Sequence, residues 1–467
     1  MPIRGLSTSN CRFGRYLGGS GLFPIFMMKP VTFVIPLLAL VAFSAPAQAM
    51  MPAPLANPDR PATTPRMDSG SASVVGASDA KICPTLRRWA GKGNSAPGLR
   101  VRSLDSGKTI CSLNSTSKRS LASNTKLFTT STSLAKFGTD HHFRTRLYAD
   151  GKIRDGVLKG SLYLKGGGDP SLGTSDFLDT YFGGDGADIE KLARLAKRAG
   201  IKRVTGRLYG DDTIFDGKRG VPDSGYATSP YIGPLSGLDI NAGFTSATLS
   251  NFSSDPARTA AKKLVKLMRG KGIRIQKQIS LRKTPASAER NLLGRVLSPN
   301  MTWTARTTNL YSNNFFAEML LKNLGAEYRG LGTTHRGTTV VERYVKKLGS
   351  WIDQKDGSGL TFGNRSTPSD VVKLLSKVRK KDFGPALIDS LPTAGVDGTL
   401  DDRMRGSAAQ GNCHAKTGTL TGVSALSGYC FNESGRKFVF SILMNGVSNL
   451  DSAHIGQDRI VAAIASR

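Results

Sequence analysis

Two cysteines near the C-terminal end of this 467-residue chain constrain its fold most strongly. Cys413 and Cys430 bracket the stretch CHAKTGTLTGVSALSGYC and lie equally far from the pair Thr421-Gly422. A two-residue hairpin turn at that pair would place the two cysteines opposite each other on adjacent antiparallel strands. The segment therefore predicts a disulfide-linked β-hairpin.

The other cysteines agree with disulfides and not with a metal site. Cys11 lies in the predicted leader described below, which leaves Cys83 and Cys111 to pair with each other. An even number of cysteines in an exported protein favours disulfides. A zinc site is the alternative, but no two cysteines have close ligand spacing, and the five histidines form no metal-like group. We expect no metal and no cofactor.

The first 49 residues have the pattern of a secretory signal. Lys29 precedes an apolar run over residues 31–43, and Ala47-Gln48-Ala49 supplies the small residues of a cleavage site. A membrane anchor is the alternative, but this run is short against the ~20 residues of a spanning helix. Residues 50–78 are rich in proline and small polar residues, and they predict a flexible linker. We expect an exported protein of the periplasm or cell envelope, soluble after signal cleavage.

Length and charge bound the organisation and the partners. A single core rarely exceeds ~250 to 300 residues, so this chain has room for a large domain and a smaller one. The formal net charge is +31, of which +27 remains after residue 49 because four cations and no acids precede that point. This charge favours an anionic envelope polymer or a membrane surface, and the export signal argues against nucleic acid. A generally basic, solvated surface is the alternative.

Hydrophobic periodicity and turn residues predict several elements. Strands are expected at 98–104 and 108–113 around Asp105-Ser106-Gly107, and a helix is expected from Ser123 to Phe137, ended by Gly138. Further helices are predicted at 188–199, 256–270 and 451–466, and a C-terminal hairpin at 424–430 and 437–444. The basic segment 262–283 alternates lysine with apolar residues, which is typical of the solvated face of folded elements.

A serine three residues before a lysine occurs six times in the chain. On a helix the two side chains share a face, so a partly desolvated lysine can serve as base for the hydroxyl. Ser123 and Lys126 lie at the first turn of the predicted helix, where free amides and the helix dipole favour negative charge. Ser133 lies deeper in that helix, and the other four pairs fall in predicted linker, turn, connection or strand. A helix cap is the alternative role for Ser123.

Two later motifs supply partners for this pair. Ser312-Asn313-Asn314 is an S-x-N, and Lys416-Thr417-Gly418 is the one K-T-G of the sequence. The ordered set S-x-x-K, S-x-N, K-T-G is the signature of penicillin-recognising serine enzymes. The alternatives are a helix N-cap pair at Ser312 and Asn314 and a surface lysine at Lys416.

Longer blocks resemble one branch of these enzymes, the low-molecular-mass class C penicillin-binding proteins. The similar blocks run from about residue 83 to the C-terminus, and they read YLKGGGDPSLG, SPYIGPLSGLDINAG, SNNFFAEML, DGSGL and AGVDGTL. Members are D-alanyl-D-alanine carboxypeptidases and endopeptidases of peptidoglycan. The resemblance implies an α/β (α+β), β-lactamase/transpeptidase-like fold, with an antiparallel sheet flanked by helices. We expect the catalytic domain at 79–149 and 293–467, and inserted subdomains at 150–292.

The resemblance also implies roles for the motif residues. Ser123 would be the acylated nucleophile and Lys126 its base, while Ser312 and Lys416 would relay a proton to the leaving amine. Asn314 would hold the substrate amide or Lys126. The remaining expected site residues are Thr417, a ligand of the terminal carboxylate together with Lys416; Thr419, an oxyanion-hole amide together with that of Ser123; and Gly418, which allows close approach of the strand to the substrate.

Side-chain recognition of the stem peptide is expected to involve Asp211 and Arg365. Asp211 lies in the stretch GDDTIFD of the insertion, where a turn is the alternative role. After DGSGL, family members often carry an arginine, whereas this chain has Thr361-Phe362, and Arg365 is the nearest substitute. The expected partners are peptidoglycan peptides and β-lactams. A catalytically silent wall-binding protein of the same fold and a β-lactamase are the rival interpretations.

Overall fold

The computed structural model describes residues 80–93 and 95–467. The predicted signal at 1–49 and linker at 50–78 lie outside the described residues. Within the part that is described, no helix is long and apolar enough to cross a bilayer. Two β-sheets with their covering helices make up most of the described chain.

The first sheet is antiparallel and five-stranded. Its strand order is β14-β15-β16-β1-β2, so the two ends of the described chain meet where β16 pairs with β1. The strands predicted from alternation are confirmed to within two residues at each end. The strands are β1 (Ala96–Ser103), β2 (Thr109–Leu113), β14 (Cys413–Leu420), β15 (Val423–Phe431) and β16 (Lys437–Asn445).

The predicted disulfide hairpin is confirmed. Strands β14 and β15 are joined by Thr421 and Gly422, and Gly422 has a φ of 71° that suits a residue without a Cβ. The register places Cys413 opposite Cys430, and the two form a disulfide. The second predicted disulfide, between Cys83 and Cys111, is also formed and joins α1 to β2.

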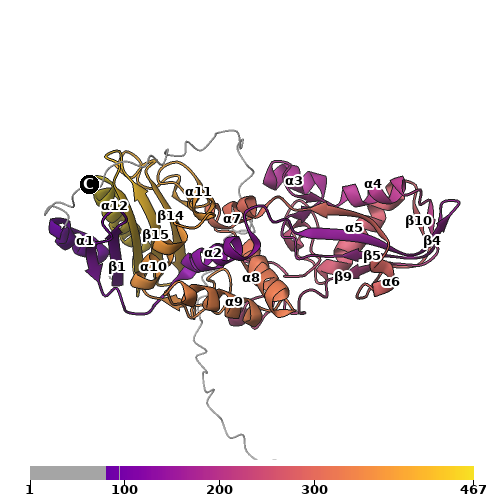
Figure 1. Ribbon diagram of the computed structural model, residues 1–467, viewed down its shortest axis with the longest axis horizontal. Coiled ribbons are helices and arrows are strands. Elements are labelled where there is room, and N and C mark those ends of the chain that lie inside the picture. Colours follow the sequence, from indigo (N-terminus) through magenta and orange to yellow (C-terminus); the bar gives the residue numbers. More distant parts are fainter. Residues whose placement is uncertain (1–79, 94) are drawn as a thin grey trace, which may run out of the picture. The chain divides into compact units, whose positions relative to one another are not determined.

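Helices cover both faces of this sheet. Helix α12 (Leu450–Ala465) contacts β15 and β16 and packs on α1 (Cys83–Ala90), whereas α10 (Pro368–Val378) contacts β15, β16 and β1 (Figure 1). Side chains alternate along the central strands, so Leu426 belongs to the core under α12 and Ala425 to the core under α10. Helices on both faces explain why every residue of β15 from Val423 to Cys430 is buried.

A helical layer continues the core on the α10 side. The predicted helix at 123–137 is confirmed, except that its first residues form a 3-10 turn, η3 (Ala122–Asn124), before α2 (Thr125–Phe137). Helix α2 is buried from Thr125 to Leu134, because other helices surround it. These are α7 (Met301–Leu310), α8 (Asn314–Arg329), α9 (Thr334–Lys347) and α11 (Gly384–Asp389).

The middle of the chain forms a second, mixed sheet with its own core. Helices α4 (Glu190–Arg198) and α5 (Pro256–Gly270) cover it, and Asp255 caps α5 as predicted (Figure 1). The sheet begins at Arg144 and ends at Leu297, a few residues beyond the expected insertion limits of 150 and 292. Its strands are β4 (Arg144–Arg154), β5 (Val157–Lys165), β8 (Arg203–Val204), β9 (Leu208–Asp211), β10 (Arg274–Ile275), β11 (Ser280–Leu281) and β12 (Leu292–Leu297).

An aromatic cluster joins the inserted region to α8. Phe315 and Phe316, in the first turn of α8, share one apolar core with Phe182 and Phe244 of the insertion. Phe182 lies at the end of α3 (Ser175–Phe182), and its ring meets that of Phe316 edge to face at 5.7 Å. The smaller elements are β3 (Arg119–Ser120), β6 (Leu172–Gly173), β7 (Ala187–Asp188), α6 (Ala286–Glu289), β13 (Arg365–Ser366) and the 3-10 turns η2 (Ala80–Ile82), η4 (Pro222–Ser224), η5 (Asn241–Gly243) and η6 (Gly398–Leu400).

Candidate active site

Ser123 lies in the 3-10 turn that leads into α2. In the fully described stretch from Arg119 to Leu134 it is the one residue that is not buried. Ala122, directly before it, has a φ of 45°. A non-glycine residue in this left-handed region stores backbone strain, a feature that clusters at functional sites. The turn therefore presents one hydroxyl out of an otherwise buried segment.

Lys126 is the main hydrogen-bond partner of that hydroxyl. Its side chain is fully buried, and Nζ lies 2.9 Å from Ser123 Oγ, 2.7 Å from Asn314 Oδ1 and 2.8 Å from the carbonyl oxygen of Ser358. Two of the three predicted motifs thus meet at one amine. The third contact comes from a backbone carbonyl that sequence motifs do not reveal.

Burial also changes the basicity of Lys126. Desolvation lowers the pKa of its amine to about 7, although the carboxyl groups of Asp356 and Glu318 partly oppose this shift. A lysine with a pKa in this range is half neutral near pH 7, so it can accept a proton from a neighbouring hydroxyl. The geometry and the pKa together make Lys126 suitable as a general base.

The start of α8 positions Asn314. Asn313, and not its neighbours, is the N-cap: its Oδ1 accepts from the amide of Phe316 at 3.0 Å. Asn314 is therefore not needed as a cap. Its Oδ1 accepts from Lys126, and its Nδ2 donates to the carbonyl of Tyr231 in the insertion at 3.1 Å.

Ser312 lies in the turn between α7 and α8, two residues before Asn314. Its φ is 54°, again in the left-handed region that non-glycine residues rarely adopt. Its amide donates to the carbonyl of Asn309 at 3.3 Å, and its side chain is partly exposed. The turn thus holds Ser312 beside Asn314 in a conformation that costs energy, which points to a role other than helix capping.

Lys416 brings a second buried amine into the site from β14. Its side chain is fully buried, and Nζ donates to the carbonyl of Thr417 at 3.0 Å. Burial, followed by the nearby charge of Lys126, lowers the pKa of Lys416 well below its ordinary value. The predicted alternative of a surface lysine does not hold, because this side chain has no solvent exposure.

Strand β14 touches the turn that carries Ser123. The side-chain amide of Asn124 donates to the carbonyl of Lys416 at 3.0 Å. A Cβ on Gly418 would lie 2.9 Å from the carbonyl oxygen of Leu121 and 3.0 Å from the amide nitrogen of Ser123. We expected this glycine to allow approach of the substrate; the structure shows that it allows approach of the Ser123 turn.

The outer side of β14 is an edge of the sheet. The amide of Ala415 donates outward, to the carbonyl of Pro392 at 2.9 Å. Because successive amides of an antiparallel strand alternate in direction, those of Thr417 and Thr419 also face this edge. The hydroxyl of Thr417 is hydrogen bonded to that of Thr399 at 2.7 Å, and Thr419 is exposed.

Two buried acids support the site, and motif analysis missed both. Glu318 is on α8, where Oε1 accepts from the amides of Gly357 at 2.9 Å and Ser358 at 2.7 Å. Asp356 accepts from the amides of Gly359 and Thr361, each at 2.7 Å. For Glu318, the signal in the sequence was its position as the one acid inside the apolar run FFAEML.

The pKa values of both acids are raised above their ordinary values. Desolvation is the main cause for each, and for Glu318 the neighbouring carboxyl group of Asp356 adds to it. Both side chains are fully buried. A pair of buried carboxyl groups beside a lysine of lowered pKa is typical of a functional site.

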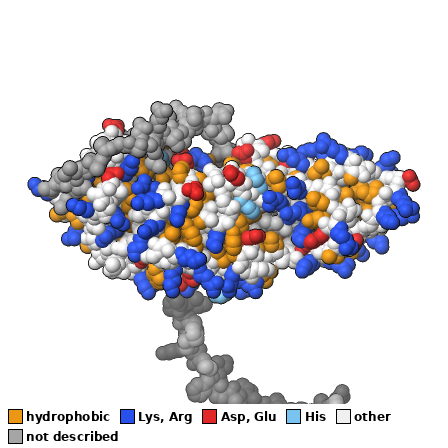
Figure 2. Space-filling view, viewed as in Figure 1, with side chains coloured by type: hydrophobic (Ala, Val, Ile, Leu, Met, Phe, Trp, Pro, Cys, Tyr) orange, Lys and Arg blue, Asp and Glu red, His pale blue; other side chains and the backbone are white. Residues whose placement is uncertain are grey.

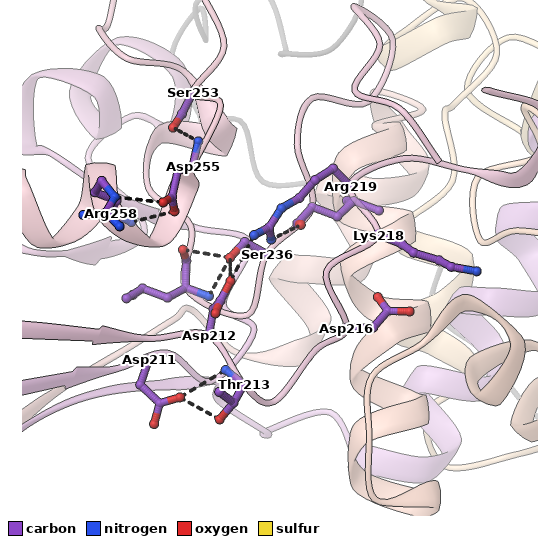
Figure 3. A network of polar contacts seen from close by, with 12 residues as sticks. Asp211, Asp212, Thr213, Asp216, Lys218, Arg219, Ser236, Ser253, Asp255 and Arg258 are labelled. Carbon is purple, nitrogen blue, oxygen red and sulfur yellow. Dashed lines mark hydrogen bonds and ion pairs between the residues drawn. The ribbon is translucent and has the colours of Figure 1, made fainter. Parts of the chain in front are cut away.

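The structure does not bring Asp211 into this group. Its carboxylate is buried at the end of β9 and accepts four hydrogen bonds, from the amide and hydroxyl of Thr213 and from those of Thr284. Figure 3 shows the two bonds from Thr213. These bonds saturate the acceptor capacity of a carboxylate. Asp211 therefore fixes a turn, the alternative role given above, and its contact with a substrate side chain stays a prediction.

Arg365 lies on the short strand β13, which pairs with β3 just before the Ser123 turn. Its side chain is exposed, and none of the described hydrogen bonds or ion pairs joins it to the Ser123 group. The insertion reaches the site through other residues. Asp223 accepts from the amide of Phe362 at 3.0 Å, and the carbonyl of Tyr231 contacts Asn314.

Metal chemistry has no visible ligand set in the described chain. Among residues 80–93 and 95–467, the His, Cys, Asp and Glu side chains form no group of three or more that could hold a metal ion. His414, which precedes the K-T-G, has Nδ1 3.2 Å from the hydroxyl of Thr393.

Comparison with known proteins places the chain among D-Ala-D-Ala carboxypeptidases. The D-Ala-D-Ala carboxypeptidase 3 (S13) family model matches residues 91–254 and 246–466. A D-alanyl-D-alanine carboxypeptidase of Actinomadura sp. (strain R39) is 30% identical over 430 residues, which cover 74% of this chain and 76% of the relative.

Solved structures share the fold. Penicillin binding protein 4 (dacB) from Haemophilus influenzae superposes with a TM-score of 0.69 at 21% identity, over 82% of this chain and 98% of that chain. The same protein, solved in complex with a novel β-lactam, gives a TM-score of 0.66 at 21% identity and the same coverage. The predicted transpeptidase-like fold is therefore confirmed. The chain belongs to the D-Ala-D-Ala carboxypeptidase 3 (S13) family.

Proposed function

We propose that this chain cleaves the D-alanyl-D-alanine bond of peptidoglycan stem peptides with Ser123 as nucleophile and Lys126 as its base. The observation that carries this proposal is the 2.9 Å contact between Lys126 Nζ and Ser123 Oγ in a buried setting that lowers the lysine pKa to about 7. A serine hydroxyl needs such a base, because it is a weak nucleophile at its own pKa.

In the acylation step, Oγ of Ser123 attacks the carbonyl carbon of the penultimate D-alanine, and its proton passes to neutral Lys126. The negative charge that develops on the carbonyl oxygen is stabilised by amide donors. The amides of Ser123 and Thr419 suit this role, because β14 packs against the Ser123 turn at Gly418 and the Thr419 amide faces the open edge.

Departure of the terminal D-alanine needs a proton on its amine. Ser312 and Lys416 are proposed to relay to this amine the proton that Lys126 took from Ser123. The amine then leaves as the C–N bond breaks and the carbonyl of the acyl-enzyme ester re-forms. Lys416 is suited to this exchange because burial lowers its pKa well below the ordinary value. Lys416 and Thr417 are also proposed to receive the terminal carboxylate. Water then attacks the ester of Ser123 and regenerates the hydroxyl.

Substrate choice is proposed to include crosslinked peptides as well as free stem peptides, giving DD-endopeptidase activity beside carboxypeptidase activity. β-Lactams are proposed to acylate the same serine. We also propose that the protein is exported to the cell envelope. Lys and Arg side chains are spread over the face seen in Figure 2 and do not gather in one patch, which supports diffuse attraction to anionic envelope polymers or membranes.

Digestion of purified muropeptides with product analysis tests this proposal. Monomeric pentapeptides should lose one D-alanine, and crosslinked dimers should yield monomers. No product from either substrate, with a folded protein, would favour a silent wall-binding protein. Rapid turnover of penicillin without muropeptide cleavage would instead identify a β-lactamase.

A further inference from the structure

The loop that carries Ser358 contacts the proposed base directly. Lys126 donates to three oxygens, and two of them, Asn314 Oδ1 and the Ser358 carbonyl, can only accept. A neutral amine has two N–H bonds and one lone pair. If both N–H bonds are held by these two carbonyl-type oxygens, the lone pair is left for the hydroxyl of Ser123.

Glu318 holds the Ser358 peptide in place. Its Oε1 accepts from the amides of Gly357 and Ser358 at 2.9 and 2.7 Å, and the carbonyl of that same Ser358 residue faces Lys126. Its Oε2 is buried and has no hydrogen-bond partner among the residues described. The carboxyl group thus binds the loop through one oxygen, Oε1.

We propose that Glu318 is a positioning residue for acylation: it orients the Ser358 carbonyl so that the lone pair of Lys126 points at Ser123. This inference rests on the proposed function. When Lys126 takes the serine proton it becomes an ammonium ion with three N–H bonds. The three acceptors around Nζ then match all three donors, so the proton is accepted without any rearrangement of the site.

The role requires an acceptor oxygen and not a negative charge. Burial and the neighbouring Asp356 carboxyl group raise the pKa of Glu318, and the two amides need only an acceptor oxygen, which the carboxyl group keeps in its neutral form as well as in its charged form. The charged or titratable groups around Glu318 and Lys126 are Asp356 from the loop, Lys322 farther along α8 and Lys416 from β14. A glutamine at position 318 would keep the acceptor oxygen and should replace the acid.

The test compares three variants by their second-order rate of acylation with a fluorescent penicillin between pH 5 and 10. Glu318→Ala releases the loop, so the rate at pH 7 should fall by about 10²-fold, as for a misplaced catalytic group. Water reaching Lys126 should also raise the pKa of its amine. The acid limb of the pH–rate profile, where the acylation rate falls as the pH drops, should therefore move to higher pH. Glu318→Gln should keep the wild-type rate above the acid limb, and its limb should not move to higher pH, because the lost Glu318 charge is one that raises the pKa of Lys126.

The matched control is Glu342→Ala on α9. Glu342 Oε1 also accepts from an amide of this loop, that of Gln354 at 3.0 Å, but four residues before Ser358. Its loss should lower the denaturation temperature without moving the acid limb. The inference is overturned if Glu318→Ala shows the wild-type limb, or if Glu318→Gln is as slow as Glu318→Ala. Should Glu318→Ala not fold, a slow Glu318→Gln alone overturns it.

Failure of the proposed function would look different. Ser123→Ala is run beside these variants, and penicillin labelling that survives it contradicts Ser123 as nucleophile, whatever the Glu318 variants do. Labelling that is lost in Ser123→Ala, together with a Glu318→Ala limb at the wild-type position, rejects the positioning role and leaves the proposed function intact.

Discussion

At the scale of single residues, the site is unusual in holding two lysine side chains without solvent exposure. Transfer of an ammonium group out of water is costly, so burial favours the neutral amine. The nearby charge of Lys126 lowers the pKa of Lys416 further. The consequence is a site in which two amines of lowered pKa are available for proton transfer.

The pH dependence of acylation follows from Lys126. Its amine must be neutral to accept the proton of Ser123, and its pKa is lowered to about 7. The acylation rate should therefore fall as pH drops through about 7 and level off above it. Stopped-flow measurement with a fluorescent penicillin checks this, and a limb near the ordinary lysine pKa, or a flat profile from pH 5 to 9, would contradict it.

Residues with short, ordered spacing could be predicted from the sequence, whereas those defined by backbone contacts could not. Ser123 and Lys126 stand at i and i+3 of one helix start, a spacing that sequence displays directly. The Ser358 carbonyl has no residue-type signal, and Glu318 differs from other glutamates only by its apolar neighbours. Asp211 is expected at the substrate because the resembled family uses acidic groups of the inserted region there, and the sequence does not show that Thr213 and Thr284 donate four hydrogen bonds to its carboxylate.

At the scale of elements, the contact between β14 and the Ser123 turn is sensitive to an added side-chain atom. Gly418 lies in the strand with no side chain, and the turn packs into the space that a Cβ would fill. The hairpin itself could be predicted, because two cysteines and one turn set its register. The packing of its edge against a helix start 292 residues earlier in the chain could not, because no local pattern encodes it.

Gly418→Ala tests this contact between β14 and the Ser123 turn. The added methyl would meet backbone atoms of Leu121 and Ser123 at about 3 Å, so the strand must move away from the turn. We expect the acylation rate to fall by about 10²-fold, as for a displaced catalytic group. Gly270→Ala at the end of α5 is the control, since nothing lies within 4 Å of its Cβ. Equal rates for the two variants would show that the close approach is unimportant.

At the scale of the whole molecule, the inserted region helps to hold α8, the helix that begins at Asn314. The aromatic cluster packs Phe182 of the insertion against Phe316 in the first turn of α8, two residues after Asn314. The insertion also contacts Asn314 directly through the carbonyl of Tyr231. Removal of the inserted region would therefore expose apolar surface and loosen Asn314, a hydrogen-bond partner of Lys126.

Phe182→Ala separates this role from simple loss of stability. Truncating a buried phenylalanine costs about 3 to 5 kcal/mol of unfolding free energy. We expect the folded fraction also to acylate more slowly, because α8 begins at the damaged cluster. Leu192→Ala, in the separate core of the insertion, should cost stability alone. Denaturant-induced unfolding measures the loss of stability, and the acylation rate of the folded fraction measures the effect on the site. An unchanged rate in Phe182→Ala would refute a link between the aromatic cluster and acylation.

The central claim is that Ser123 is the residue that forms the acyl-enzyme. Peptide mapping by mass spectrometry after brief exposure to benzylpenicillin tests it most directly. We predict one adduct, on the peptide that contains Ser123, and none in a folded Ser123→Ala protein. An adduct on any other residue, or an adduct that persists in Ser123→Ala, would contradict the account.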